Sequence, residues 1–579
     1  MNDFSANPVD LSAFGNVRDS GTDATETFTK ALAYCREHPG STLLVPPGRY
    51  DFFADKAHSR PFVLSNSDVA SERRCAILIE DQCGLTLHAY GARFVCHGRL
   101  QPVSVVRSSA VVLAGFAIDW EHPLNAEVQV LATDPAGTVD VEIDPVQYPH
   151  VVENGKLLIG DLREPWEWEM VFGGDDLAVV PGTGDGWIRE RFETRALASD
   201  RLRLHVSTSM LPRAGDWLVL RTPKRDHAGL FIAESRDIRL RDIRLHHSAG
   251  LGCLVQFCEN VDIERFEAVP SPGRHVLSGH DDGIHVSNCR GRVRISGCRF
   301  HGLMDDPINV HGTSVAVAER LDARSLRCAF SHPQSVGLPW GNVGDRMNIL
   351  HGASMTSIGE NTVAAIGSDT RPGSFIVSFD KDLPDGIGPE NALENLTWSP
   401  EVEIRDCQFG SCRARGLLLS TPLRSLVINN HFDSSGSAIL ISGDARCWYE
   451  SGGVRDCLIA GNTFSDLCLG SMYQYCEAII SICPDILSPH PEIPVHRGIV
   501  ITDNDIHTSG QPVLYALATH DLVFRDNRIH RSSRIPPWHP RKEMTALEAC
   551  RNVTITGNKI EYPCCPRPGD HAGARKEKP

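Results

Sequence analysis

Two similar hexapeptides in the middle of the chain each begin with a pair of aspartates. The first spans Asp281–Val286, the second spans Asp305–Val310, and their starts are 24 residues apart. If 24 residues form one structural coil, the two pairs lie one above the other, about 4.8 Å apart at the strand spacing of a β-sheet. Carboxylates this close perturb each other's pKa values, so the four aspartates are candidates for acid/base chemistry.

A frame of alternating apolar residues recurs along the chain and predicts the elements that carry the aspartates. The frame starts at Leu85, Val111, Ile238, Val261, Val293, Val402, Leu426, Cys457, Ile499, Leu522 and Val553, mostly in steps of 23 to 42 residues. Several frames close with Gly-Asn or Asp-Asn, which is typical of short strands that end in tight turns. Repeats of this length indicate a solenoid, so we predict an all-β fold built on a right-handed parallel β-helix.

Two steps in the series, of 127 and 109 residues, are too long for a single coil. Both segments show hairpin-like alternation and predict inserted all-β subdomains, either small barrels or sandwiches. The predicted organisation is an N-terminal cap with the first coils (1–121), a first insertion (122–225), central coils with the aspartates (226–312), a second insertion (313–399), C-terminal coils (400–562) and a disordered polar tail (563–579).

Two residue types of the repeat have structural explanations. Asparagines occupy the turn position at Asn462, Asn504, Asn527 and Asn558, where an Asn can adopt a left-handed backbone and hydrogen-bond along the stack. The 19 cysteines include several in the frame, and no CxxC pair with histidine partners at zinc spacing accompanies them. We therefore expect free, buried thiols, no metal site and no cofactor.

Composition and charge restrict the classes of partner. A net charge of −16 argues against nucleic acid or an anionic membrane. The segment Met1–Asp10 lacks the basic and apolar runs of a signal peptide, and no apolar stretch reaches the about 18 residues of a membrane-spanning helix. A cytoplasmic location and a secreted or periplasmic one after processing both remain open. The oligomeric state is also open, a homodimer being one option.

Sequence motifs narrow the family. Asp10–Asp19 and Val45–Tyr50, with a short amphipathic helix between them, resemble the opening of polygalacturonase-like β-helix proteins, in which the helix covers the exposed strand edges at the solenoid end. Gly302–Gly312 and Asp282–Gly291 resemble the α-1,3-galactosidases of glycoside hydrolase family 110. Further similar segments are Ile118–Glu121, Ala414–Thr421, Gly443–Glu450 and Glu477–Asp485. The resemblance runs from about residue 10 to 562, and Asp281 stands where the family pattern has no acid.

The resemblance implies a reaction and roles for the aspartates. It implies hydrolysis of terminal α-1,3-linked galactose, with inversion, on a β-helix that carries two β-barrel insertions. Asp305 would be the general acid, and Asp282 and Asp306 would position and deprotonate the water. Inverting glycosidases generally hold the two groups about 6.5–9.5 Å apart. The glycan could be of blood-group B type, a linear galactosyl-α-1,3-galactose, or an algal galactan.

Several other side chains are predicted to contact the sugar. Strand alternation sends Asp282 and Asp306 inward, unless a bend in the preceding turn tilts them into a cleft. The residues that it places outside the coil are Asp281, His285, Asp305, Asn309 and His311. Alignment of successive coils puts Leu251, Asp282, Asp306, Arg415, Ser437, Glu477 and Gln511 in one column. The complete set of predicted sugar contacts is Trp120, His285, Asn309, His311, Arg415, Trp448, Glu450 and Glu477.

Other interpretations of the same residues remain. The paired aspartates could cap turns or bind calcium along the solenoid, and the charged side chains could be solvated surface groups. A polygalacturonase-like hydrolase of uronic polymers would use similar carboxylates, but it would also use an Arg-x-Lys clamp, and no Arg-Ile-Lys string is present. A non-catalytic glycan-binding β-helix would not need the three aspartates together, and a lyase would need calcium and a basic residue beside a uronate.

Overall fold

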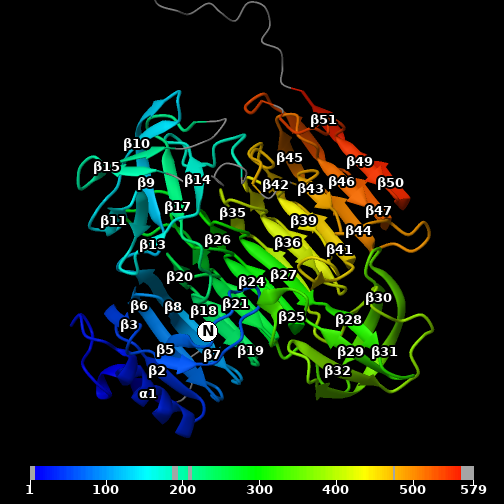
Figure 1. The fold of residues 1–579 in the computed structure, drawn as a ribbon, viewed down its shortest axis with the longest axis horizontal. Helices are drawn as coiled ribbons and strands as arrows, with labels where there is room; N and C mark the ends of the chain where they lie inside the picture. The colour runs from blue at the N-terminus through cyan, green and yellow to red at the C-terminus, as the bar shows by residue number, and fades with distance from the viewer. Residues whose placement is uncertain (1–6, 185–192, 206–210, 474–475, 537, 563–579) are drawn as a thin grey trace, which may run out of the picture.

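The computed structural model describes residues 7–184, 193–205, 211–473, 476–536 and 538–562. The predicted tail, 563–579, lies outside these ranges. The described chain forms a parallel β-helix with two all-β insertions (Figure 1), which confirms the predicted fold class. The helix α1 (Thr25–Glu37) lies at the N-terminal end of the solenoid, where its buried face joins the solenoid core.

Each central coil contributes strands to three faces of the solenoid. One such coil contains β24 (Ile284–Ser287), β25 (Arg290–Ser296) and β26 (Arg299–Phe300). Each of the three strands pairs in parallel with the equivalent strand of the coil before and of the coil after. Stacks of this kind build a 23-stranded sheet and a 13-stranded sheet around one apolar core.

Because equivalent residues pair between coils, similar side chains stack in the interior. Phe300, Phe409, Phe432 and Phe464 form one such column, with successive ring centroids 5.5, 4.3 and 5.1 Å apart. These aromatic contacts extend along the solenoid axis and help to fix the registration of neighbouring coils.

The turn asparagines form a continuous ladder, which confirms that they are structural. The backbone N–H groups of Asn430, Asn462, Asn504 and Asn527 each donate to the side-chain oxygen of the next asparagine, ending at Asn558. The left-handed residue is the one before the asparagine, however: Gly461 has φ 65° and Asp503 has φ 56°. The asparagine side chain therefore bonds the stack, and its neighbour makes the turn.

The cysteines that the structure describes are unbridged, and most of them are buried, as predicted. Burial raises the pKa of thiols such as Cys253, to about 12, which keeps them protonated and unreactive. Among the described residues no helix is long and apolar enough to cross a membrane.

The first insertion folds around its own apolar core. It has a six-stranded sheet, in the order β14-β17-β9-β10-β16-β15, and a three-stranded sheet, β11-β12-β13. Its first strand, β9 (Ala126–Asp134), pairs antiparallel with its last, β17 (Trp217–Arg221). The pairing returns the chain close to the point where it left the solenoid.

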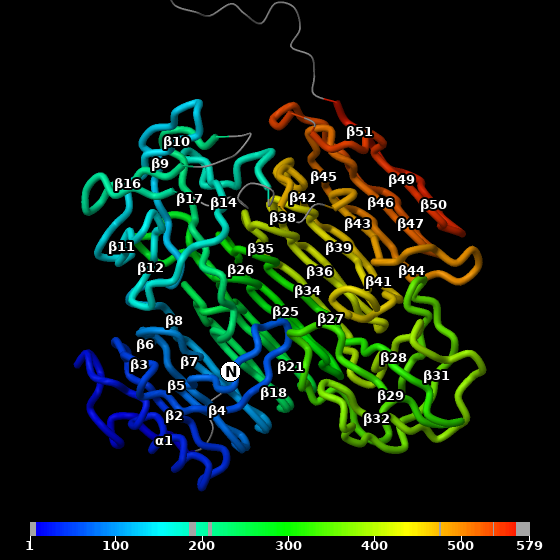
Figure 2. Tube along the Cα trace, viewed as in Figure 1, coloured from blue at the N-terminus to red at the C-terminus, as the bar shows by residue number. Residues whose placement is uncertain are grey.

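The second insertion is a closed six-stranded barrel, β28-β29-β32-β31-β30-β33, with a core of its own. It runs from β28 (Val315–Arg320) to β33 (Asn391–Asn395), and these two strands also pair with each other. Figure 2 shows the two insertions on either side of the central strands β27 (Ile308–Thr313), β36 (Leu417–Ser420) and β39 (Ile439–Ile441).

Candidate active site

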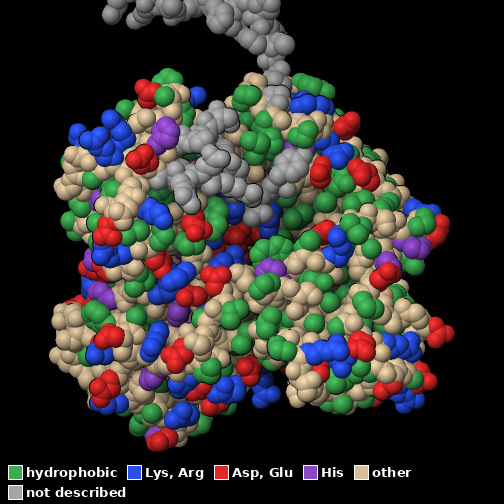
Figure 3. Space-filling model, viewed as in Figure 1, with side chains coloured by type: hydrophobic (Ala, Val, Ile, Leu, Met, Phe, Trp, Pro, Cys, Tyr) green, Lys and Arg blue, Asp and Glu red, His purple; other side chains and the backbone are tan. Residues whose placement is uncertain are grey.

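A cavity of about 540 Å³ lies over these central strands, between the two insertions. Its floor includes Asn309 of β27, Leu418 of β36 and Leu440 of β39. Figure 3 shows acidic and basic side chains gathered in the hollow at the centre of this face. The remaining lining residues are Asn66, Asp68, Trp168, Arg221, Pro223, Arg225, Asp282, Asp305, Asp306, Gln334, Arg413, Arg415, Ser442, Asp444, Trp448, Glu450 and Asp485.

The catalytic candidates lie in the turns that lead into two neighbouring strands. Ile284 of β24 pairs with Ile308 of β27, so Asp282 and Asp306 hold equivalent positions two residues earlier. Because they precede the strands, strand alternation does not govern their direction, and both line the cavity. The inward orientation expected from alternation is therefore wrong, and both carboxylates instead line the cavity, as the alternative predicts.

Asp282, Asp305 and Asp306 form a compact trio. One oxygen from each lies within 4.8 Å of the others; Asp282 and Asp306 are buried, and the side chain of Asp305 is 14% exposed. The spacing is shorter than the 6.5–9.5 Å that is usual between the acid and the base of an inverting glycosidase. Inversion, which the resemblance implies, thus has no support from carboxylate spacing.

Burial and mutual repulsion raise the pKa values of two members of the trio, Asp282 and Asp306. Burial, together with the charges of Asp305 and Asp306, raises the pKa of Asp282 well above its usual range. Burial also raises the pKa of Asp306 to about 7, although Arg415 opposes the shift. Arg415 donates to Asp306 through its backbone N–H (2.8 Å) and its guanidinium (2.7 Å). Asp282 and Asp306 therefore retain protons near neutral pH, as an acid/base site requires.

A chain of hydrogen bonds continues from Asp282 into the protein. His285 Nδ1 lies 2.7 Å from Asp282 Oδ2, and His285 Nε2 lies 2.9 Å from His311 Nε2. His311 Nδ1 lies 2.6 Å from the Gly312 carbonyl oxygen and must donate to it, because a carbonyl only accepts.

The direction of this chain follows from that last bond. With a neutral His311, Nε2 accepts from His285 Nε2–H, and a neutral His285 then accepts at Nδ1 a proton carried by Asp282 Oδ2. Burial lowers the pKa of His285 well below its usual range, which favours the neutral ring. His285 and His311 thus control the proton on Asp282.

Asp281, the acid outside the family pattern, does not face solvent as alternation predicts. It is fully buried, bonded to Arg221 and to His280. Although burial opposes ionisation, Arg221, Arg225 and His280 hold the pKa of Asp281 well below its usual range. Arg225 Nη1 lies 3.6 Å from Asp281 and 3.9 Å from Asp305, so the buried carboxylate helps to hold a cation beside the trio.

Two exposed tryptophans stand on different walls of the cavity. Trp168 of the first insertion lies against the Arg221 guanidinium, 5.3 Å from the ring centroid. Trp448 stacks on His332 of the second insertion, with ring centroids 4.2 Å apart. Asp444 positions the Trp448 loop by accepting four backbone N–H groups, from residues 446 to 449.

The cavity floor and rim also hold polar acceptors. Asn309 Oδ1 is buried without a hydrogen-bond partner in the described structure. Glu450 accepts from Asn66 at 2.6 Å and lies 3.7 Å from His311 Nε2. Of the predicted sugar contacts, Asn309, Arg415, Trp448 and Glu450 line the cavity.

The other predicted sugar contacts are corrected. His285 and His311 are both 1% exposed and lie behind Asp282 instead of facing the cavity. Trp120 is buried in the solenoid core, with its indole N–H bonded to the Gly98 carbonyl. Trp120 is the last residue of the strand β8 (Val112–Trp120), and its ring lies on the side of that strand that faces the core. Burial at this position removes a large aromatic surface from water.

Glu477 was assigned to the wrong register. Ile439 pairs with Ile480, so the residue equivalent to Ser437 is Ala478, one position later. A slip of one residue moves a side chain to the opposite face of a strand, and Glu477 instead pairs with Arg541 at 3.0 Å. The same slip places Pro512, and not Gln511, in the column, whereas Leu251, Asp282, Asp306, Arg415 and Ser437 are aligned as predicted.

Sequence reasoning missed most of the cavity walls. Three of the missed lining residues could have been predicted from the sequence. Arg413 lies two residues before Arg415, and Asp444 and Asp485 fall in motifs that carry the family resemblance. Trp168, Arg221, Arg225 and Gln334 come from the insertions or their boundaries and Asn66 from an N-terminal loop, where no repeat pattern marks a position.

Comparisons with known proteins agree with this architecture. Two family models match, GLAA-B β-barrel domain I at residues 126–218 and domain II at 325–393. The α-1,3-galactosidase B of Bacteroides thetaiotaomicron is 39% identical, over 96% of this chain and 91% of its own length. The α-1,3-galactosidase A of Bacteroides fragilis is 32% identical, over 96% of this chain and 92% of its own.

Among solved structures, an exopolygalacturonase from Thermotoga maritima aligns with a TM-score of 0.45 and 11% identity, covering 96% of this chain and 93% of its own. These two sequence relatives span nearly the whole chain at 39% and 32% identity. The chain therefore belongs to the α-1,3-galactosidase family.

Proposed function

We propose that this protein is an exo-acting glycosidase that removes terminal α-1,3-linked galactose from glycans. The observation that carries the proposal is the trio Asp282, Asp305 and Asp306 at the cavity floor, with oxygens within 4.8 Å of one another. Close carboxyls that retain protons near neutrality can supply both the acid and the base of glycoside hydrolysis.

The shape of the cavity supports action at a chain end. Its walls come from four parts of the chain: an N-terminal loop with Asn66, the first insertion with Trp168, the second insertion with Gln334, and the C-terminal coils with Asp485. A polymer bound at internal positions would need a groove open along the solenoid. Walls on several sides instead favour a single terminal residue.

The charges of the cavity favour a neutral sugar over a uronate. Seven acidic residues line it, against four arginines. The arginines already lie beside aspartates: Arg221 and Arg225 beside Asp281, Arg413 beside Asp305, and Arg415 beside Asp306. These arginines are therefore already paired and are not available to a galacturonate carboxylate, which disfavours the polygalacturonase alternative.

The roles follow the division that the resemblance implies. Asp305, the most exposed of the three, protonates the departing oxygen, and Asp282 and Asp306 hold the attacking water from below. As Asp282 takes a proton from the water on Oδ1, its Oδ2 proton passes to His285 Nδ1, 2.7 Å away. Because burial lowers the pKa of His285, it holds this proton only transiently, and His311 fixes the orientation of its ring.

Sugar recognition is assigned to the remaining lining groups. Trp168 and Trp448 offer aromatic surface for the apolar face of galactose. Asn309 Oδ1, which lacks a partner, and the Glu450 carboxylate would accept from sugar hydroxyls. A galactose that supplies these bonds would satisfy groups that are costly to leave unpaired in a closed cavity.

The test is a panel of substrates given to the purified protein. Linear galactosyl-α-1,3-galactose and its fucose-branched counterpart should release galactose, whereas α-1,4- and α-1,6-linked galactosides and galacturonan should not. Cleavage of galacturonan instead would overturn the proposal. Proton NMR of the first product should show β-galactose if the reaction inverts, and α-galactose would mean retention.

A further inference from the structure

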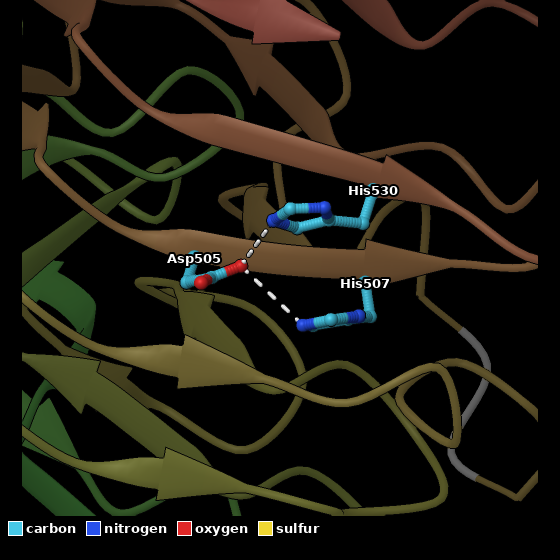
Figure 4. Close-up of side chains that lie close together, drawn as sticks. All are labelled: Asp505, His507 and His530. Atoms are coloured by element: carbon cyan, nitrogen blue, oxygen red, sulfur yellow. Dashed lines mark ion pairs between the residues drawn. The ribbon is translucent and has the colours of Figure 1, made fainter. Parts of the chain in front are cut away.

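Three ionisable side chains converge on the outer face of the C-terminal coils, and none of the three lines the cavity. Asp505 and His507 belong to β45 (Asp505–Thr508), and His530 belongs to β48 (Arg528–Arg531), the equivalent strand of the next coil. His507 pairs in register with His530, and Asp505 precedes His507 by two residues, so all three share one face of the sheet. Figure 4 shows the two imidazoles directed at the carboxylate.

The distances suit a metal ion. Asp505 Oδ1 lies 3.3 Å from His507 Nε2 and 2.9 Å from His530 Nε2, and the three ligand atoms all lie within 4.8 Å of one another. Zinc bonds to nitrogen and oxygen are about 2.0–2.2 Å long, so neighbouring ligand atoms in tetrahedral or octahedral sites are about 2.9–3.5 Å apart. Because the two ring planes are 18° from parallel, both imidazoles would have to turn about χ2 for their Nε2 lone pairs to meet at one ion.

Hydrogen bonding does not account for the cluster. Asp505 Oδ1 is shielded from solvent and makes no hydrogen bond in the described structure, although both imidazoles lie at ion-pair distance from it. The imidazoles stack on each other with centroids 4.6 Å apart and planes 18° from parallel. A cation among the three ligand atoms would satisfy all of them at once.

One histidine already has an outer partner of the kind that metal ligands use. His530 Nδ1 lies 3.2 Å from Glu561 Oε2, on β51 (Lys559–Glu561) of the following coil. A carboxylate on Nδ1 keeps the proton there and leaves the Nε2 lone pair free for a metal. His530 and Glu561 are paired in register, so the backbone holds this contact in place.

We propose that Asp505, His507 and His530 bind a divalent transition-metal ion, with Glu561 as a positioning residue. Two imidazoles and one carboxylate favour Zn²⁺ over Mg²⁺ or Ca²⁺, which prefer oxygen ligands. Water completes the coordination. The ion bonds to two coils directly and to the third through Glu561, and so fastens together the strands β45, β48 and β51 at the C-terminal end of the solenoid (Figure 1).

The experiment is zinc binding by equilibrium dialysis of the full chain after treatment with a chelator. Wild type should bind one more equivalent of Zn²⁺ than the double variant His507→Gln/His530→Gln, and zinc should raise the melting temperature of wild type only. Glu561→Gln should weaken zinc binding at this site about 10–100-fold, but the number of Zn²⁺ ions bound per chain at saturation should stay the same. Mg²⁺ and Ca²⁺ should not compete. Equal zinc uptake by wild type and the double variant would overturn the proposal.

Two matched controls separate this cluster from other ligand groups. His431 Nε2 lies 3.0 Å from Asp433 Oδ2 on the same outer face, but the pair has no second histidine, so His431→Gln should keep the equivalent. Cys447→Ser, which changes the separate group of Asp444, Cys447 and Asp485, should also keep it. If the double variant does not fold by circular dichroism, Asp505→Asn takes its place and should lose the same equivalent; retention would refute the site.

Discussion

Replacing His285 with glutamine should lower turnover strongly and leave KM close to the wild-type value. His285 is 1% exposed and does not line the cavity, so it makes no contact with the sugar that KM would report. Its Nδ1 lies 2.7 Å from Asp282 Oδ2, where it can accept the proton that Asp282 must release. Glutamine can hydrogen-bond to Asp282, but it cannot take up that proton.

The size of the effect follows from the role. Positioned general bases contribute about 10²–10⁴-fold to rates, which corresponds to about 3–5 kcal/mol of activation free energy at 1.36 kcal/mol per tenfold. Because the interaction matters in the transition state and not in substrate binding, kcat and kcat/KM should fall together. Initial rates on galactosyl-α-1,3-galactose, measured across the pH range in which both proteins stay folded, give the two constants.

A matched control is His496→Gln. His496 is equally buried and its Nδ1 accepts the Val454 backbone N–H at 3.0 Å, but it does not line the cavity or contact the trio. The control should lose stability without losing turnover. A rise in KM with unchanged kcat in His285→Gln would show that His285 contacts the sugar, and the proton chain from Asp282 would then be wrong.

Three further outcomes are expected. Asp305→Asn should reduce turnover by about 10²–10⁴-fold with an unchanged melting curve, and near-normal hydrolysis would remove Asp305 from the acid role. Because the pKa of Asp306 is raised to about 7, the fraction of its carboxylate form grows as the pH rises through that value. The value of kcat/KM should rise with this fraction, and Asp306→Asn should abolish this rise of kcat/KM with pH. Trp448→Ala should raise KM about 2–10-fold, in line with about 0.5–1.5 kcal/mol for aromatic contacts, whereas Trp120→Ala should cost about 3–5 kcal/mol of unfolding free energy without changing KM. Steady-state kinetics and denaturant unfolding distinguish the two tryptophans, and a shared effect on KM would contradict the placement of Trp120 in the core.

Much of the fold could be predicted because a solenoid is encoded locally. Each strand pairs with its equivalent one coil later, so the spacing of apolar residues along the chain translates directly into stacking in space. The asparagine ladder from Asn462 to Asn558 and the equivalence of Asp282 and Asp306 follow from that spacing. Both aspartates precede their strands, so they line the cavity, although alternation predicts that they point into the core.

Errors arose where spacing between coils varies. The coil before Ile480 carries a longer loop, and a displacement of one residue in its alignment moved Glu477 onto the wrong face. Trp120 was misplaced for a related reason, since a residue at the end of a strand can turn into the core or out to solvent and its type does not decide between them. Periodicity alone therefore predicts neither the register of Glu477 nor the direction of the Trp120 side chain.

The coil, the pairing of the aspartates and the family could all be predicted from the amino-acid sequence. The groups that surround the aspartates are known only from the packing of the folded chain. Asn66 and Glu450, 384 residues apart, meet at 2.6 Å, and Arg225, which follows the first insertion, reaches the trio at Asp305. Contacts of this kind depend on how the insertions and loops pack against the solenoid, and that packing is set by surfaces brought together only after the coils have stacked, with no periodic signal in the chain to mark them.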